Sequence, residues 1–530
     1  HEFSDDSWQT NATYNDGEDG EDKLQRKRNA EQAYFEFMPI DHAALHININ
    51  VAGTGLLAVD KDEHLYPKTK IYRDFQFGQH LHLFLTDYRT NRPDHLIPED
   101  GFPGTVVMDT AVITGFLTAI GKTPAEITGT LSLMSPVVNI DLAVYSAQKL
   151  LLQNALMVEY TKELTNRLVI GETAAQVKAA EMVSDVLKGK LTTSYLNLVL
   201  TKAKATLADD HFLKNTPQLP ENAQDAIDDF SDATFENGLA YFSMGKTTLF
   251  SDLGARYLVI KSSFDLYAGY KASQDPAAQA AYSSDQATWL ATGLGMATAN
   301  NVKNKVIASS VSTAPLLADL SGSRPTLADG TAEATLAAIL GTGLVPDLLK
   351  QQFYLNVDHW DGFPQGKEQI VKTILEANGA ITLSGDIHSS FVTEHDLNDG
   401  TTQAVDFTTS SVSSGTFGSF LSEGLDTLIS QLGPIPDGLD ALKALFDDIA
   451  LASSTRAGVN SKLTLAKMGE HGVSIATATS TGFNVVYHNV KAELNTTSKS
   501  YYNNRKAYLD QVNTHEFNWA GTGNAVTKVS

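Results

Sequence analysis

The sequence predicts a layered α/β fold in which helices flank a sheet. Three observations lead to this prediction. Hydrophobic residues make up 42% of the 530 residues, which is enough to bury a sizeable core. Short apolar or alternating runs of strand length occur between stretches with helical spacing. One long, purely helical block interrupts this mixture. Strands and helices mixed in this order favour a sheet covered by helices, with chemistry in the loops at the strand ends.

The first part of the chain, residues 1–103, is expected to begin the core of this fold. A polar start is followed by a helix over Lys23–Pro39, which has apolar residues at helical spacing. Within the stretch Ile71–Asp87, the run from His80 to Leu85 alternates and then becomes apolar, as an interior strand does.

The block 104–248 carries long helical patterns over Asp141–Leu164, Ala174–Lys188 and Thr192–Ala208 and is predicted to be a helical insertion. The core resumes over 249–412, a second insertion rich in Gly, Ser and Pro spans 413–452, and late core strands fill 453–530. Within the resumed core, the elements expected are strands at Tyr257–Ile260, Lys305–Ser310 and Ala380–Ser384, and helices at Asp285–Ala299 and Lys367–Asn378.

Composition narrows the classes of function. The 39 Lys and Arg against 62 Asp and Glu give a formal net charge of −23, which disfavours nucleic-acid binding of the usual basic kind. Two interpretations of this charge stay open. One is that it serves solvation in a salty or extracellular medium; the other is that the carboxylates concentrate divalent cations. No apolar run reaches the length of a membrane span. With no cysteine present, disulfides, thiolate metal sites and cysteine nucleophiles are excluded.

The most informative run is Ser384-Gly385-Asp386-Ile387-His388, where an apolar strand ends in an acid and a histidine two residues apart. Gly385 suits a backbone turn. In an extended segment, residues i and i+2 point to the same side, so Asp386 and His388 could converge on one metal ion. Carboxylate with imidazole suits zinc, manganese or iron, and the carboxylate also suits calcium. A surface turn with a capping Asp is the alternative interpretation.

Two further runs are candidate site segments. Trp360-Asp361-Gly362-Phe363-Pro364 has the composition of a tight turn whose acid can face a ligand or simply stabilise the turn. Arg89 and Arg92 follow Asp87 directly after the strand that ends near Leu85. Guanidinium groups bind phosphate oxygens in a bidentate manner, so these arginines are candidate phosphoryl ligands; a salt bridge that pins the loop is equally compatible.

The chain begins with His1-Glu2, a weak signal for a general acid. This abrupt start, with no preceding leader, predicts that the sequence is a fragment or a processed form whose upstream part, signal peptide included, is missing.

Together these runs resemble the family of PhoD-like alkaline phosphatases and phosphodiesterases, and they keep that family's order along the chain. The matching positions are His1-Glu2 with Asp5-Asp6, Asp87 with Arg89 and Arg92, Gln286 with Trp289 and Leu290, Trp360–Pro364, Ser384–Ser390 and Thr408–Ser414.

The resemblance implies a metallophosphoesterase-like β-sandwich flanked by helices and a site with several metal ions, expected to be calcium and iron, with zinc or manganese as alternatives. It implies Asp386 and His388 as metal ligands, and His1, Arg89 and Arg92 as catalytic groups. Substrate contacts are expected from the two arginines with Trp360 and Asp361. The substrate would be a small phosphate ester, a mono- or diester, and the protein would be periplasmic or secreted.

The sequence also departs from the family pattern. The acids that precede the first histidine, a Gly-Asp-x-x-Tyr motif and a metal-binding cysteine would all lie upstream of His1, and Asp5-Asp6 replace a pair of asparagines. The alternative to a phosphoesterase is therefore a catalytically incomplete fragment or degenerate homologue that binds cations or phosphate without turnover. The sequence does not indicate an oligomeric state.

Overall fold

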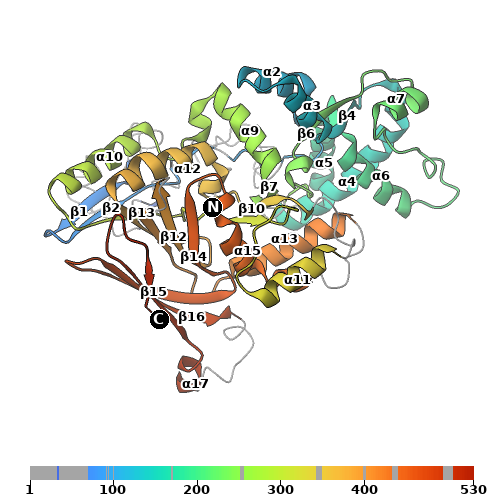
Figure 1. Ribbon diagram of the computed structural model, residues 1–530. Helices are drawn as coiled ribbons and strands as arrows, with labels where there is room; N and C mark the ends of the chain where they lie inside the picture. The colour runs from blue at the N-terminus through green and yellow to red at the C-terminus, as the bar shows by residue number, and fades with distance from the viewer. Residues whose placement is uncertain are drawn as a thin grey trace, which may run out of the picture.

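The computed structural model describes residues 33–34, 37, 70–90, 92–93, 95–98, 101–168, 171–250, 256–341, 349–397, 401–432, 440–492 and 505–529. Its centre is a seven-stranded mixed sheet, on the left in Figure 1. The strand order is β1 (Arg73–Phe77), β2 (Leu81–Leu85), β8 (Asn304–Ala308), β11 (Ala380–Ser384), β13 (Thr401–Thr408), β12 (Ser390–Leu397) and β14 (Ser461–Lys467).

The middle of this sheet is parallel. Strand β8 lies between β2 and β11 and pairs parallel with both, and β11 in turn pairs parallel with β13. The outer pairs β1–β2, β12–β13 and β12–β14 are antiparallel. Because β2, β8 and β11 run in the same direction, the loops that follow them meet at one edge of the sheet.

A second sheet packs against one face of the first. It contains β15 (Glu470–Ala478), β16 (Phe483–Lys491), β17 (Asn513–Trp519) and β18 (Thr527–Lys528). The core between the two sheets joins Val306, Ile381 and Phe407 of the large sheet to Tyr487 and Phe517 of the small one. The Tyr487 hydroxyl donates a 3.0 Å hydrogen bond to the carbonyl oxygen of Phe391 and so links the sheets directly.

Helices cover the other face of the large sheet (Figure 1). Phe84, Ile307 and Ala380 point to this side and pack against α10 (Ser284–Ala299) and against the helix formed by α12 (Pro364–Ile370) and a π-helical turn, Val371–Glu376. In β2, Leu81 and Leu83 instead contact the core between the sheets, which is the alternation that the sequence predicts. The mixed α/β class is confirmed; its identity with a metallophosphoesterase sandwich stays a prediction.

The predicted helical block has a core of its own. Helices α4 (Ser146–Leu168), α5 (Glu172–Val186) and α6 (Thr193–Thr206) pack together through one buried cluster, on the right in Figure 1. The shorter helices of the block are α2 (Thr110–Ala119), α3 (Pro124–Ser132) and α7 (Ala223–Phe230). The block also contains a small sheet that was not predicted from the sequence, with the order β3 (Val106–Met108), β6 (Glu236–Ala240), β4 (Ser135–Asn139) and β5 (Lys190–Thr192).

The remaining elements form a third group beside the large sheet. A three-stranded sheet contains β7 (Tyr257–Ile260), β10 (Gln352–Asn356) and β9 (Leu317–Asp319). Around it lie α9 (Lys261–Gln274), α11 (Gly330–Gly341), α13 (Phe417–Leu432), α14 (Asp440–Lys443) and α15 (Phe446–Ser453), and the short helix α17 is Arg505–Leu509. The predicted second insertion, residues 413–452, thus holds α13, α14 and most of α15. The predicted helix over residues 23–39 lies outside the described residues, apart from Ala33, Tyr34 and Phe37, which are helical.

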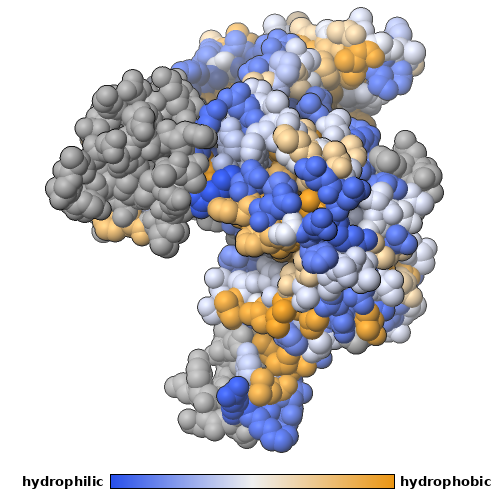
Figure 2. Space-filling view, turned by 90° about the vertical axis from the view of Figure 1, so that its left-hand side faces the viewer, coloured by the Kyte–Doolittle hydropathy of each residue, from blue (hydrophilic) through white to orange (hydrophobic). Residues whose placement is uncertain are grey.

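The outer surface is mostly hydrophilic on the face seen in Figure 2, with apolar residues concentrated in its lower half, at the height of the C-terminal sheet in Figure 1. On β15, Val473 and Ile475 are about half exposed. Among the residues that the structure describes, no helix is both long enough and apolar enough to cross a membrane.

Replacement of Tyr487 by Phe should lower the free energy of unfolding by about 1 kcal/mol, because it removes the hydrogen bond between the sheets without a change in buried volume. Urea denaturation measures this. Val473→Thr, on the exposed outer face of β15, is the control and should change stability by less than about 0.5 kcal/mol. Equal losses in both variants would show that the Tyr487 bond does not stabilise the sheet packing.

Candidate active site

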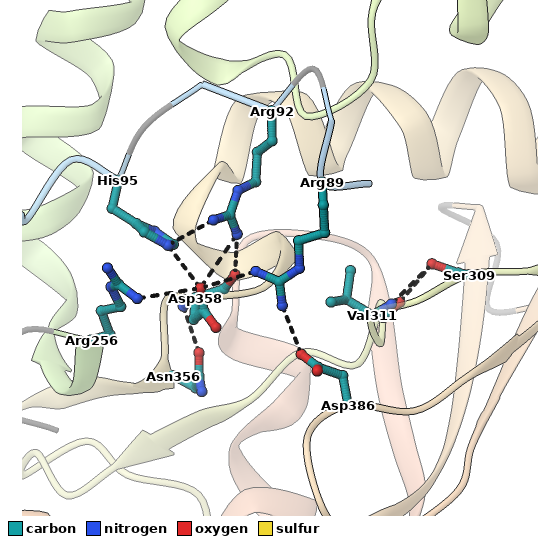
Figure 3. A network of polar contacts seen from close by, with 9 residues as sticks. All are labelled: Arg89, Arg92, His95, Arg256, Ser309, Val311, Asn356, Asp358 and Asp386. Carbon is teal, nitrogen blue, oxygen red and sulfur yellow. Dashed lines mark hydrogen bonds and ion pairs between the residues drawn. The ribbon is translucent and has the colours of Figure 1, made fainter. Parts of the chain in front are cut away.

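The candidate site lies at the edge of the large sheet where three parallel strands end. Asp87 follows β2, Ser309 follows β8 and Asp386 follows β11, so segments far apart in the sequence come together there. Figure 3 shows the polar groups of this edge, where Arg89 reaches Asp386 and where Asp358, which follows β10, lies among arginines.

Asp87 forms the turn that carries the arginines. Its carboxylate accepts hydrogen bonds from the backbone N–H groups of Arg89 and Thr90, both at 3.0 Å. An Asp side chain that bonds the backbone two or three residues onward is a turn-forming motif, which explains an acid at this strand end. Asp87 is itself 4% exposed, so its role is to shape the loop.

Arg89 is the arginine that reaches the surface. Its guanidinium donates to the carboxylate of Asp386 at 2.9 Å and lies 3.5 Å from that of Asp358. The side chain of Arg89 is 19% exposed and that of Asp386 is 35% exposed, whereas Asp358 is 11% exposed. Arg89 is therefore held at its far end by two carboxylates while part of its charge still faces solvent.

Asp358 is surrounded by cations. Arg92 donates to its backbone carbonyl at 2.9 Å and lies 3.3 Å from its carboxylate, His95 lies 2.7 Å from the carboxylate, and Arg256 lies 3.8 Å away. The side chain of Arg92 is completely buried and that of Arg256 is 4% exposed. Burial alone would raise the pKa of Asp358, but the His95 contact and the charges of Arg256 and Arg89 hold this pKa well below its usual range.

Arginine side chains gather at this edge. The guanidinium groups of Arg89, Arg92 and Arg256 lie 3.5, 3.3 and 3.8 Å from the carboxylate of Asp358. In a protein with a net charge of −23, a cluster of arginines that includes one partly exposed guanidinium favours an anionic ligand.

Asp386 and His388 adopt an unexpected backbone conformation. Strand β11 ends at Ser384, and residues 386–389 form a bend instead of the extended segment expected from the sequence. Asp386 has φ 69° and His388 has φ 56°, whereas Gly385, the residue expected to need such freedom, has no positive φ. Non-glycine residues in the left-handed region are uncommon and cost free energy, and they concentrate at functional sites.

His388 is oriented by the backbone. Its Nδ1 lies 2.5 Å from the carbonyl oxygen of Gly415. A carbonyl oxygen only accepts, so Nδ1 carries the proton and, in the neutral ring, the lone pair is on Nε2. Metal-binding histidines are commonly fixed in this way by a hydrogen bond at the second ring nitrogen.

The residues present fit part of a metal site. Asp386 offers a carboxylate that is partly exposed, and His388 offers an oriented imidazole. Across the described part of the chain, however, no three His, Asp or Glu side chains are grouped so that they could hold an ion. These two side chains could therefore supply two ligands, and the calcium and iron implied by the family resemblance stay a prediction.

Trp360 and Asp361 are both buried residues. Trp360 is 1% exposed and packs edge-on against Tyr88 and Tyr282. Asp361 is 2% exposed; its carboxylate pairs with Lys367 at 2.5 Å and accepts a hydrogen bond from the backbone of Leu316 at 2.9 Å. These contacts favour a supporting role for both residues, and direct contact with a substrate stays a prediction.

The remaining predicted residue, His1, lies outside the described residues. His95, Arg256 and Asp358 were not singled out from the sequence as site residues. Asp358 lies two residues before the run Trp360–Pro364, so its neighbourhood was a signal. His95 and Arg256 have no local signal, because only the fold brings them to Asp358.

Replacement of Asp358 by Asn should lower the free energy of unfolding at pH 7 by about 3–5 kcal/mol, because it removes the carboxylate that contacts the buried guanidinium groups of Arg92 and Arg256. Since the pKa of Asp358 is lowered in the folded state, its contribution is present above the unfolded value near 4 and is lost as pH falls through the folded value. The acid side of the stability–pH curve should therefore be less steep in the variant. Urea titrations between pH 3 and pH 7 measure both effects.

Asp386→Asn is the matched control. It removes the more exposed of the two carboxylates that contact Arg89 and should lower the free energy of unfolding by less than about 1 kcal/mol. Equal losses in the two variants would contradict the assignment of Asp358 as the buried counter-charge.

A family model and a solved structure match this chain. A family model described as PhoD-like phosphatase matches residues 1–124 and 237–438 and thus contains Arg89, Asp358, Asp386 and His388. A solved structure described as "Structure of PhoD" has 11% sequence identity to this chain and a TM-score of 0.35; the match covers 99% of this chain and 53% of that one. The chain thus spans about half the length of that protein. No curated protein matches.

The family model leaves out residues 125–236, which fall within the helical block predicted over 104–248, while the limits of that block stay a prediction. The matched segments make up more than half of the chain and carry the arginines, the acids and the histidine of the site in order. This chain therefore belongs to the PhoD-like phosphatase family.

Proposed function

We propose that this chain carries out metal-dependent hydrolysis of phosphate esters, with Arg89 as the group that binds the phosphoryl oxygens. The observation that carries the proposal is the partly exposed guanidinium of Arg89, which lies beside the buried Arg92 and Arg256 in a chain of a phosphatase family. Guanidinium groups bind phosphate oxygens through paired hydrogen bonds and stabilise the charge of a phosphoryl transition state.

The surrounding residues hold Arg89 in position. Asp358 holds the guanidinium from the buried side, while Arg92 and Arg256 balance the charge of Asp358. The side chain of Arg92 is completely buried, so this arginine acts on the phosphoryl group through Asp358 and Arg89. Arg89 is thereby presented at the surface without a large loss of side-chain freedom on binding.

Asp386 and His388 are the proposed metal ligands in this chain. A bound metal ion would polarise the phosphoryl oxygen and lower the pKa of a bound water. The backbone bond of His388 to Gly415 points Nε2 away from that carbonyl. His1 is proposed to donate a proton to the leaving oxygen, a role that rests on the sequence alone. Mono- and diesters are both candidate substrates, and a periplasmic or secreted location is proposed from the family.

Replacement of Arg89 by Ala should lower kcat/KM for p-nitrophenyl phosphate and bis(p-nitrophenyl) phosphate about 100-fold or more, because it removes a charged hydrogen-bond donor from the phosphoryl group. Arg89→Lys should recover little of the loss, since an ammonium does not make the paired bonds. Arg324→Ala is the matched control: its side chain is 17% exposed and pairs with Glu333 at 2.7 Å. Unchanged kcat/KM in Arg89→Ala would rule out the proposed role.

Removal of metal ions by a chelator should abolish the release of p-nitrophenol, and His388→Ala should weaken the binding of Ca²⁺ or Mn²⁺ measured by calorimetry about tenfold or more. His488→Ala, a half-buried histidine on β16, should leave metal binding unchanged. Activity that is indifferent to the chelator would contradict the metal mechanism.

One combination of results would favour the alternative function. If the chain binds inorganic phosphate through Arg89 and binds metal through His388, but hydrolyses neither ester, it acts as a phosphate- and cation-binding protein without turnover.

A further inference from the structure

The first turn of helix α10 is hydrogen-bonded, through one buried side chain, to the segment that follows strand β2. Gln286 is fully buried, and its amide makes two hydrogen bonds to the same residue, Asp87. The side-chain oxygen accepts from the backbone N–H of Asp87 at 2.7 Å, and the side-chain nitrogen donates to the backbone carbonyl of Asp87 at 2.7 Å. The two residues are 199 positions apart in the sequence.

This pairing fixes a backbone direction. A side-chain amide carries its NH₂ donor group and its carbonyl acceptor side by side in one plane, so it can bond the N–H and the C=O of one residue in the way that a neighbouring strand does. The end of β2 is thereby held at the residue where the turn to Arg89 begins. A second contact from the same segment, from the Tyr282 hydroxyl to the hydroxyl of Thr86 at 3.1 Å, holds the preceding residue.

Asp87 in turn hydrogen-bonds the backbone of Arg89. While Gln286 holds its backbone, the Asp87 carboxylate accepts the backbone N–H groups of Arg89 and Thr90, both at 3.0 Å. Gln286 is in turn fixed by its position in the helix, where its own N–H donates to the N-cap hydroxyl of Ser283 at 3.3 Å. A continuous series of hydrogen bonds therefore runs from the start of α10 to the backbone of Arg89.

We propose that Gln286 is a positioning residue for Arg89: by clamping the backbone of Asp87 it sets the direction in which the guanidinium meets the phosphoryl group. The clamp is an inference from the contacts alone, while its catalytic consequence rests on the proposed function of Arg89. An apolar residue of similar volume would fill the same space but make neither bond to Asp87, so the amide serves the backbone that it contacts and not the filling of the core alone.

Two substitutions of Gln286 distinguish a positioning role from a role in filling the core. Gln286→Glu keeps the shape and the acceptor but places a carboxylate oxygen against the Asp87 carbonyl. Gln286→Met keeps the volume and removes both hydrogen bonds. The matched control is Asp285→Asn, an isosteric exchange of acid and amide at the adjacent position; Asp285 is exposed, and its contact is with Lys70.

Hydrogen–deuterium exchange of the whole chain tests the clamp directly. In both Gln286 variants the backbone amides in a peptide covering residues 84–92 should exchange about tenfold faster than in the wild type or in Asp285→Asn, because each order of magnitude corresponds to the loss of roughly one buried hydrogen bond. Exchange in the C-terminal sheet reports on global folding and should stay unchanged in the Met variant, which introduces no buried charge. Unchanged protection of residues 84–92 in both variants would overturn the proposal.

Calorimetric titration with inorganic phosphate tests the consequence. The Gln286 variants should bind phosphate about tenfold more weakly than the wild type, with Asp285→Asn equal to the wild type. Lost protection with unchanged phosphate affinity would overturn the positioning role. If the wild type itself shows no phosphate binding that depends on Arg89, the proposed function fails, whereas the exchange experiment still decides whether the clamp exists.

Discussion

The site depends on the buried carboxylate of Asp358. Cations can be buried only where a counter-charge and hydrogen bonds replace the water that they lose. Arg92 and His95 come from the loop after β2, Arg256 precedes β7, and Asp358 itself follows β10. One carboxylate thus ties the edge of the large sheet to the three-stranded sheet, and Arg89 is held at the junction.

Much of this arrangement could be predicted from the sequence because it depends on local patterns. Strands β7 and β11 have the predicted limits, and Arg89 and Asp386 were both placed at strand ends. That the two side chains touch follows from the parallel order β2–β8–β11, which was not predicted. Arg256 and His95 could not be predicted as partners of Asp358, since their contacts are set by packing between distant segments. The left-handed conformations of Asp386 and His388 likewise have no signature in the sequence.

Buried side chains also hold the loops of the site in place. The pair Asp361–Lys367 bonds the backbone of Leu316 and the carbonyl oxygen of Ala314, so it fixes the segment that follows β8. Asp87 and Gln286 do the same for the segment after β2. Several residues of the recognisable motifs thus hold the backbone in the conformation that presents the exposed groups.

The helical block is attached to the rest of the fold in a way that bears on how such proteins diverge. Strand β3 near its start pairs antiparallel with β6 near its end, and the family model resumes at residue 237, within β6. The two ends of the block therefore lie side by side. Because its two ends are paired and it has a core of its own, a change in the length of this block need not disturb the edge where Arg89 meets Asp386.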